Sequence, residues 1–180
     1  SNASISVVPK YWSEFYDLAT KLTVKDASLN ITKSAFSLGE YSNVVNADEI
    51  ISLLVMQAGN PITARRPGSA EVDILFNQRL DFPVAPAELA VNFYTEFSNP
   101  LKPFYSWNRA LPDSKSMFLS GDLAIYLGFA SELADIRLKN PNLNFDISAI
   151  PQTKSSERNI TFGRMVGLAI TKNSKNIAGA

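Results

Sequence analysis

The sequence predicts an α/β fold with a mixed central sheet flanked by helices. Some stretches repeat apolar residues at intervals of three and four, as one face of a helix does. Other stretches alternate apolar and polar residues, as half-buried strands do. The two patterns alternate along the chain, which is typical of α/β proteins. At 180 residues, 46% of them hydrophobic, the chain is long enough to bury a core, and one domain is favoured.

The first half predicts a helix over residues 11–23, a strand over 31–35, a helix over 46–58, a short strand over 72–76 and a helix over 85–97. Asn46 is a favourable N-cap for the second helix, and Gly59 suits its C-terminal stop. Apart from the short strand, residues 60–84 are expected to form a long surface loop, because Pro and Gly residues interrupt them. The inward side chains expected on the third helix are Leu89, Ala90, Phe93 and Phe97.

The second half predicts a short helix that ends at Phe118, with Asp113 or Ser114 as its cap, and a turn at Gly121. A core strand over 123–127, a helix over 130–139 and two further strands over 145–150 and 161–171 are expected to follow. Residues 1–3, Ser-Asn-Ala, resemble an expression-tag scar and are left out of the fold prediction. Residues 4–180 are expected to form a single lobe.

The amino-acid composition argues against several classes of function. Lys plus Arg and Asp plus Glu number 17 each, and this balance gives no support for a nucleic-acid partner. The chain has no His and no Cys, which removes the commonest general base and thiolate chemistry. The absence of Cys also modestly favours an extracytoplasmic location. We expect no metal, no cofactor and no catalytic residue.

Specific catalytic motifs are not found in the sequence. A Ser nucleophile would need Lys or a carboxylate as its base, and neither phosphate-binding Gly motif occurs. The carboxylates Asp122, Glu132 and Asp135 lie near the 123–127 strand, where surface or capping roles are the simpler interpretation. A hydrolase that uses Asp122 or Glu132 remains the least favoured hypothesis.

A small-ligand site is predicted at loops that adjoin the strands. The carboxyl end of a strand followed by a helix start is where α/β proteins bind small ligands. Aromatic faces stack on sugar rings, while amides and hydroxyls bond to sugar hydroxyls. The candidate binding residues are Tyr41, Ser42, Asn43, Tyr105, Trp107, Asn108, Gly128, Phe129, Ser131 and Arg164. The alternative, that Tyr105 and Trp107 only pack their loop onto the core, stays open.

Six segments in order carry a family resemblance: PKYWSEFYDLATKLT, ITKSAFSLGEYSNVVNADEIISLLVMQAGN, FYTEFSNPLKPFYSWN, MFLSGDLAIYLGFASEL, NPNLNFDISAIPQ and FGRMVGLAITKNSKN. The most specific piece is F-x-x-G-x-x-A-[MI], at Phe118, Gly121, Ala124 and Ile125. The chain resembles the family 1 extracellular solute-binding proteins of ABC transporters, the maltose-binding-protein-like receptors for sugars. The resemblance extends over nearly the whole chain, from Pro9 to Asn176.

The resemblance implies a periplasmic-binding-protein-like (type II) fold, of which this chain is the C-terminal lobe. A two-lobed clamp of this kind closes on its ligand by hinge motion. The implied ligand contacts come from the loop at 41–43, the loop at 128–131 and the loop that holds Trp107. Relatives often carry an aromatic where this chain has Arg164 and Met165, a departure that leaves the ligand class open.

The first hypothesis is therefore a solute-binding lobe of an ABC importer whose ligand is a saccharide or another small polar solute. Its expected partners are an N-terminal lobe and the transporter permease subunits, its expected location is extracytoplasmic, and the lobe alone is expected to be monomeric. The second hypothesis is a non-transport interaction or structural domain of the cell envelope that keeps the clamp fold.

Overall fold

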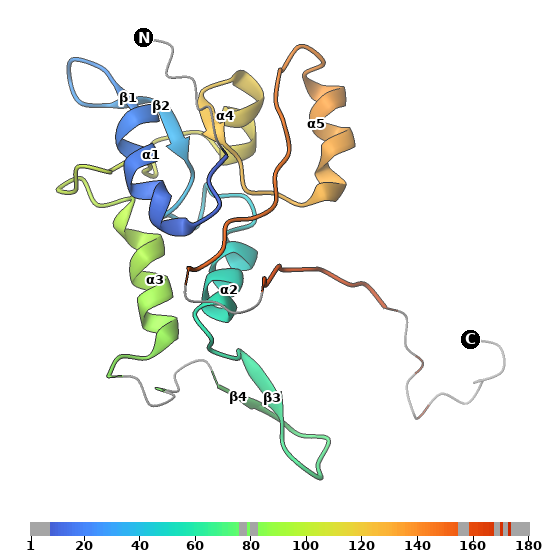
Figure 1. Ribbon diagram of the computed structural model, residues 1–180. Helices are drawn as coiled ribbons and strands as arrows, with labels where there is room; N and C mark the ends of the chain where they lie inside the picture. The colour runs from blue at the N-terminus through green and yellow to red at the C-terminus, as the bar shows by residue number, and fades with distance from the viewer. Residues whose placement is uncertain are drawn as a thin grey trace.

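The computed structural model describes residues 8–75, 79, 83–154, 159–167, 170 and 173, and shows an α/β fold (Figure 1). Residues 1–3 lie outside the described part. The elements are η1 (Trp12–Glu14), α1 (Phe15–Leu22), β1 (Val24–Lys25), β2 (Ile31–Phe36), α2 (Ala47–Gln57), β3 (Thr63–Arg65), β4 (Val72–Ile74), α3 (Pro86–Glu96), α4 (Ser114–Ser120), β5 (Leu123–Ile125), η2 (Ala130–Glu132) and α5 (Leu133–Lys139).

The main sheet is mixed and has the strand order β1-β2-β5. β1 runs antiparallel to β2, whereas β2 and β5 are parallel, with Ser34 opposite Leu123 and Phe36 opposite Ile125. Helix α1 packs on β2, α4 packs on β5, and α2 packs on α3. Because β2 and β5 are parallel neighbours, the loops that follow them leave the sheet at the same edge.

Aromatic rings form much of the core between α1, α3 and β2. Phe36 lies 4.6 Å from Phe15 and 5.0 Å from Phe97, measured between ring centroids. Tilted and edge-on pairs of this kind suit the quadrupoles of the rings. Phe97 in turn contacts Phe104, so the loop after α3 is held against the same cluster. Helix α1 and the end of α3 thus pack on β2 through a shared aromatic core.

The predicted helices are all present, and their termini follow the expected chemistry in part. Asp113 caps α4 by accepting a hydrogen bond of 3.0 Å from the Ser116 amide. Gly59 and Gly121 have φ angles of 87° and 81°, a backbone region that glycine enters without strain. The inward orientation expected for Leu89 is wrong: its exposed fraction is 55%, whereas Ala90 and Phe97 are buried. Leu89 lies outside the stripe of α3 that faces α2.

Two predicted strands are corrected. Residues 145–150, all of them described, form no strand, and neither do the described residues 159–167. Gln152 forms backbone hydrogen bonds with Lys10 and Trp12. This isolated bridge attaches the segment to the start of the chain without making it a strand of the sheet. Residues 168, 169 and 171 of the strand expected over 161–171 lie outside the described residues. The 123–127 strand is also shorter than expected and is not entirely core, because Ala124 is exposed.

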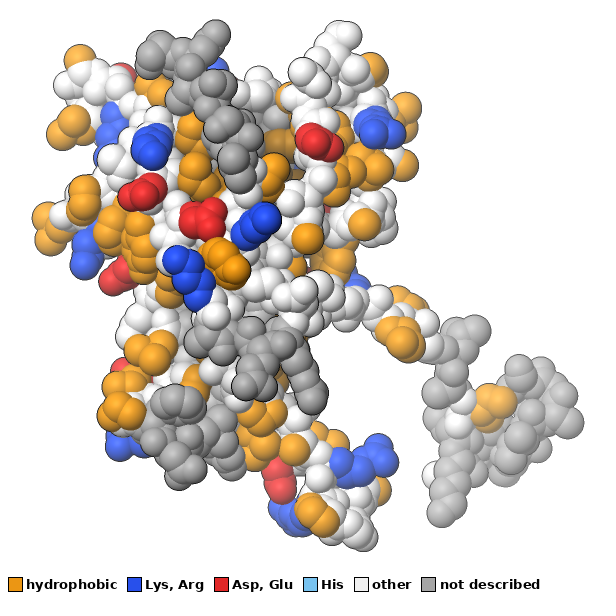
Figure 2. Space-filling model, in the orientation of Figure 1, with side chains coloured by type: hydrophobic (Ala, Val, Ile, Leu, Met, Phe, Trp, Pro, Cys, Tyr) orange, Lys and Arg blue, Asp and Glu red, His pale blue; other side chains and the backbone are white. Residues whose placement is uncertain are grey.

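Two segments extend from the body. β3 and β4 form an antiparallel hairpin below α2, where a single strand and a long loop were expected. The described residues 161–167 run outward in extended form beyond the helices (Figures 1 and 2). Met165 and Val166 on this second segment are almost fully exposed.

Candidate functional site

A partly open cavity of about 170 Å³ lies at the carboxyl end of β5. Its walls come from the first turns of α2, the loop after β5, residue 150 and residues 161–162. The lining residues are Asn46, Glu49, Ile50, Leu53, Leu127, Gly128, Phe129, Ile150, Thr161 and Phe162. Most are apolar, and the polar groups lie on α2 and at Thr161. Both Gly128 and Phe129, which the sequence selects as binding residues, line this cavity.

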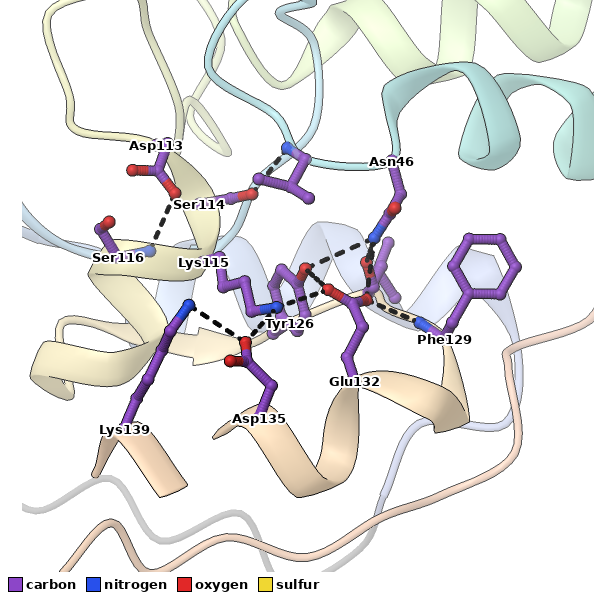
Figure 3. Close-up of polar contacts among 12 residues, drawn as sticks. Asn46, Asp113, Ser114, Lys115, Ser116, Tyr126, Phe129, Glu132, Asp135 and Lys139 are labelled. Atoms are coloured by element: carbon purple, nitrogen blue, oxygen red, sulfur yellow. Dashed lines mark hydrogen bonds and ion pairs between the residues drawn. The ribbon is translucent and has the colours of Figure 1, made fainter. Parts of the chain in front are cut away.

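Glu132 holds the loop that carries Phe129. Its carboxylate accepts hydrogen bonds of 2.9 Å from Lys115 Nζ, 3.0 Å from the Tyr126 hydroxyl, 2.9 Å from the Phe129 amide and 3.1 Å from Asn46 Nδ2. Lys115 lies on α4, Tyr126 and Phe129 follow β5, and Asn46 directly precedes α2 (Figure 3). Glu132 therefore ties the loop after β5 to the start of α2, which both line the cavity, and to α4. The Phe129 ring points away from this polar network.

The protonation state of Glu132 follows from the same contacts. Burial alone would raise the pKa of this carboxyl, but hydrogen bonds from Lys115, the Phe129 amide, Tyr126 and Asn46 outweigh burial and keep the pKa below its ordinary value. Burial and the nearby Glu132 charge raise the pKa of the Tyr126 hydroxyl. Glu132 is therefore ionised at neutral pH, as a positioning carboxylate rather than a proton donor.

Lys115 extends this network. Its ammonium lies 2.9 Å from Glu132 Oε1 and 2.8 Å from Asp135 Oδ2, and Asp135 also pairs with Lys139 at 3.1 Å. Hydrogen bonds to Asp135 and Glu132 raise the pKa of Lys115. The first turn of α5 is thereby linked to α4.

Asn46 does not cap α2 with its side chain. The residue has a φ of 65°, in the left-handed region that Asn tolerates better than most residues, and its side chain makes no cap hydrogen bond. Its amide group instead donates to Glu132 and lies 3.4 Å from the Tyr126 hydroxyl. Asn46 occupies the N-cap position of α2, as the sequence predicts, but the expected capping hydrogen bond is not formed because this longer-range network takes the amide.

Gly128 is required for close approach in the same loop. A Cβ atom at this position would lie 2.5 Å from Tyr126 Cε1 and 2.6 Å from Glu132 Oε2. Real Cβ contacts are not this short, so any side chain would displace the Tyr126 ring or the carboxylate. The glycine thus allows Glu132 to reach the Phe129 amide.

Arg164 lies beside the cavity. It forms an ion pair with Glu49, and its guanidinium carbon is 5.5 Å from the centroid of the Phe129 ring. The Phe129 and Phe162 rings lie 6.3 Å apart. The predicted residues Phe129 and Arg164 are therefore brought together, although they are far apart in the sequence.

Trp107 is a correction to the predicted site. Its side chain has an exposed fraction of 0%, and its indole nitrogen donates to Asn43 Oδ1 at 3.1 Å. A side chain with no exposed surface offers nothing to a ligand. The alternative interpretation, in which Trp107 packs its loop onto the core, is the one that the structure supports.

Asn43, Asn108 and Tyr105 also make structural contacts with one another's loops. Asn43 Nδ2 donates to the Asn108 and Leu111 carbonyls at 2.9 and 3.0 Å. Asn108 Nδ2 donates to the Tyr105 hydroxyl at 2.8 Å. These residues join the loop after β2 to the aromatic loop, residues 104–108, and do not line the cavity.

The other predicted residues are at the surface. Tyr41 has an exposed fraction of 64%, and Ser42 and Ser131 are also exposed. A hydrogen bond to Asp48 raises the pKa of Tyr41. None of the three lines the cavity, so the structure divides the predicted set between the cavity, the core and the surface.

Sequence reasoning missed Asn46 and Glu49 as cavity residues. One signal could have found them. If 31–35 and 123–127 are parallel neighbours, the helix start after the first strand must lie beside the loop after the second. Ile150 and Phe162 carried no comparable signal, because their segment was expected to form strands.

Among the described residues, no group of three or more Asp and Glu side chains is placed to hold a metal ion. Within that same part of the chain, no helix has the length and apolar character to cross a membrane. Comparisons with protein-family models, with curated proteins and with solved structures find no match for this chain.

Proposed function

We propose that this chain is a solute-binding lobe of an ABC importer, with a type II periplasmic-binding-protein-like fold and a saccharide or another small polar solute as its ligand. The observation that carries the proposal is the cavity at the carboxyl end of β5, beside the first turn of α2. Ligands of open α/β sheets bind at this edge. The sequence resemblance points to the same loop.

The cavity wall has the mixed character that such a ligand needs. Phe129 and Phe162 supply aromatic faces, and Asn46 and Glu49 supply polar atoms beside them. Aromatic faces stack on the apolar faces of sugar rings, and amide and carboxylate groups fix the hydroxyls. The loop of Phe129 is held in place by Glu132, which favours a preformed site.

The cavity is open on part of its surface, so this chain by itself encloses a ligand incompletely. In the proposed receptor an N-terminal lobe covers the open side by hinge closure, and both lobes together contact the permease. The proposed location is extracytoplasmic. Most of the surface of a tightly bound small ligand is buried, so we expect this lobe alone to bind sugars weakly.

Calorimetric titration of the complete gene product with saccharides and with other small polar solutes tests the proposal. We expect one class of small polar solute to bind, and Phe129→Ala to weaken its binding at least tenfold. Phe145→Ala is the matched control, because Phe145 is also half-buried but does not line the cavity. If no small solute binds the complete gene product, or if Phe129→Ala binds as well as the wild type, the proposal is wrong.

A second candidate, an interaction domain without transport, is favoured by the two apolar projections. Val72 and Ile74 lie exposed on the β3–β4 hairpin, and Met165 and Val166 lie exposed on the extended segment. Exposed apolar side chains that gather on projecting segments are typical of protein-binding surfaces. This candidate predicts that Phe129→Ala changes no binding property, whereas replacing Val72 and Ile74 with Ser removes binding of a protein partner.

A further inference from the structure

The wall of the cavity contains a carboxylate that is paired by a cation from outside the cavity. Glu49 lines the cavity and its side chain is only 12% exposed, whereas the side chain of its partner Arg164 is 65% exposed. An exposed guanidinium is well solvated and loses little when its ion pair opens. A largely buried carboxylate without a partner is costly. Glu49 therefore needs a cation, but that cation need not be Arg164.

Phe129 completes the surroundings of this cation. The guanidinium carbon of Arg164 lies 5.5 Å from the centroid of the Phe129 ring, within the range of a cation–π contact. A carboxylate on one side and an aromatic face on the other are the two groups that bind ammonium and guanidinium ions. Arg164 thus occupies a position that suits the cationic group of a ligand.

The space next to this position suits an apolar group. The cavity measures about 170 Å³, and six of its lining side chains are apolar: Ile50, Leu53, Leu127, Phe129, Ile150 and Phe162. An apolar cavity of about 150 Å³ accommodates a benzene ring. A six-membered ring or a short hydrocarbon chain therefore fits beside the carboxylate.

We propose that Glu49 and Phe129 form a cation site, that the cavity beside them takes the apolar part of the same ligand, and that Arg164 fills the cation site until such a ligand displaces it. The ligand class is a small organic cation, an ammonium or guanidinium group on an apolar ring or chain. This inference rests on the proposed function, because it assigns a solute class to the same cavity. A neutral ligand that displaced Arg164 would leave Glu49 unpaired, which gives the site its selectivity.

Titration of this chain with benzylammonium, benzyl alcohol and benzoate, followed by amide chemical shifts in NMR, tests the proposal. The three probes share a ring and differ in charge. We expect benzylammonium to bind about tenfold more tightly than benzyl alcohol, and benzoate to bind most weakly. Raising the salt concentration screens the charge of benzylammonium, so its affinity should fall, whereas the affinity of the neutral benzyl alcohol should not change.

Two variants separate the roles of Glu49 and Arg164. Glu49→Gln removes the preference for benzylammonium over benzyl alcohol. Arg164→Gln increases benzylammonium affinity several-fold, because the competing guanidinium is gone. The controls are Glu88→Gln, an exposed glutamate in the first turn of α3, and Arg137→Gln, an exposed arginine on α5 that does not line the cavity.

Equal affinity for benzylammonium and benzyl alcohol, no binding of either, or an Arg164→Gln variant that binds benzylammonium no better than the wild type would overturn the inference. Saccharide binding by the complete gene product that depends on Phe129 but not on Glu49 would overturn the inference and leave the proposed function standing. If the complete gene product binds no solute while benzylammonium binding follows the expected pattern, the solute-binding proposal fails and the cation site remains.

Discussion

Trp107 anchors the aromatic loop through both its ring and its indole nitrogen. The ring is fully buried, and the nitrogen donates to Asn43, whose own amide holds two carbonyls of the same loop. A buried Ser34 hydroxyl also donates to the Ser106 carbonyl at 2.7 Å. The residues that looked most like ligand contacts in the sequence therefore act in the stability of the fold.

Trp107→Ala is expected to lower the free energy of unfolding by about 3–5 kcal/mol, because it leaves a large cavity and an unpaired Asn43 oxygen. Urea denaturation measures this change. Tyr41→Ala serves as the control, since a residue with 64% exposure changes stability by less than about 0.5 kcal/mol. A Trp107→Ala variant as stable as the wild type would show that the indole is not part of the core.

Gly128 controls the geometry of the cavity at the level of a single carbon atom. Gly128→Ala introduces a Cβ within 2.6 Å of two side-chain atoms, and we expect a loss of about 1–3 kcal/mol in unfolding free energy. Gly163→Ala is the control, because no heavy atom lies within 4 Å of its added Cβ. Thermal denaturation of both variants gives the comparison. Equal melting temperatures would indicate that the loop after β5 has room that the structure does not show.

At the scale of elements, Glu132 couples α4, β5 and the start of α2. Its pKa in the folded protein lies below its ordinary value, which is about 4.3 in an unfolded chain. Between the two values the unfolded chain binds a proton that the folded chain does not bind. The contribution of Glu132 is therefore complete above the unfolded pKa and is lost as the pH falls through the folded pKa.

Glu132→Gln is expected to be less stable than the wild type at pH 7, and the difference should shrink as the pH falls from about 5 toward 3. Urea midpoints measured across this range test the expectation. Glu88→Gln, on the exposed side of α3, should follow the wild type at each pH. A difference between Glu132→Gln and the wild type that stays constant with pH would contradict the role assigned to the ionised carboxylate.

Helices were predictable from the sequence to a larger extent than strands. Helix α4 carries its own signals, a capping Asp113 and a terminating Gly121, so local chemistry sets its limits. The alternation of Phe145, Ile147 and Ala149 looks like a strand, but a strand also needs a neighbour, and that pairing is not encoded locally. The sequence did not predict β3, the strand that pairs with β4. All three of its residues are exposed, so they show no alternation of apolar and polar residues.

For the molecule as a whole, Gln57 connects the start of the chain to its later part. Its Oε1 accepts from the Trp12 indole at 2.5 Å, and its Nε2 donates to the Pro151 and Ile160 carbonyls at 3.0 and 2.9 Å. The last two bonds hold the segment that supplies Ile150, Thr161 and Phe162 to the cavity. One buried amide on α2 thus supports a wall of the site.

Gln57→Leu keeps the side-chain volume but removes these hydrogen bonds, and we expect it to lower the free energy of unfolding by about 2–3 kcal/mol. Solute affinity should also fall, because the wall of the cavity is no longer held to α2. Denaturation and calorimetry measure the two effects. Asn92→Leu, an exposed amide on α3, is the control. Unchanged solute affinity in Gln57→Leu would show that residues 150, 161 and 162 are not part of the site.

The position of the candidate site was predictable, but only some of its residues were. The rule for strand ends selected Gly128 and Phe129, which line the cavity. It also selected Asn43, which does not line it. Trp107 was selected as an aromatic residue in a loop, and composition does not distinguish an aromatic that faces a cavity from one that fills the core. Glu49 acquires its place only through the parallel pairing of β2 and β5, and its ion pair with Arg164 spans most of the chain.

Amide chemical shifts, followed while the complete gene product is titrated with its solute, test directly whether a small solute binds at the carboxyl end of β5. We expect the largest changes at Asn46, Gly128, Phe129 and Thr161, around the cavity. Changes confined to Tyr41, Ser42 and Tyr105, with none around Phe129, would contradict this expectation.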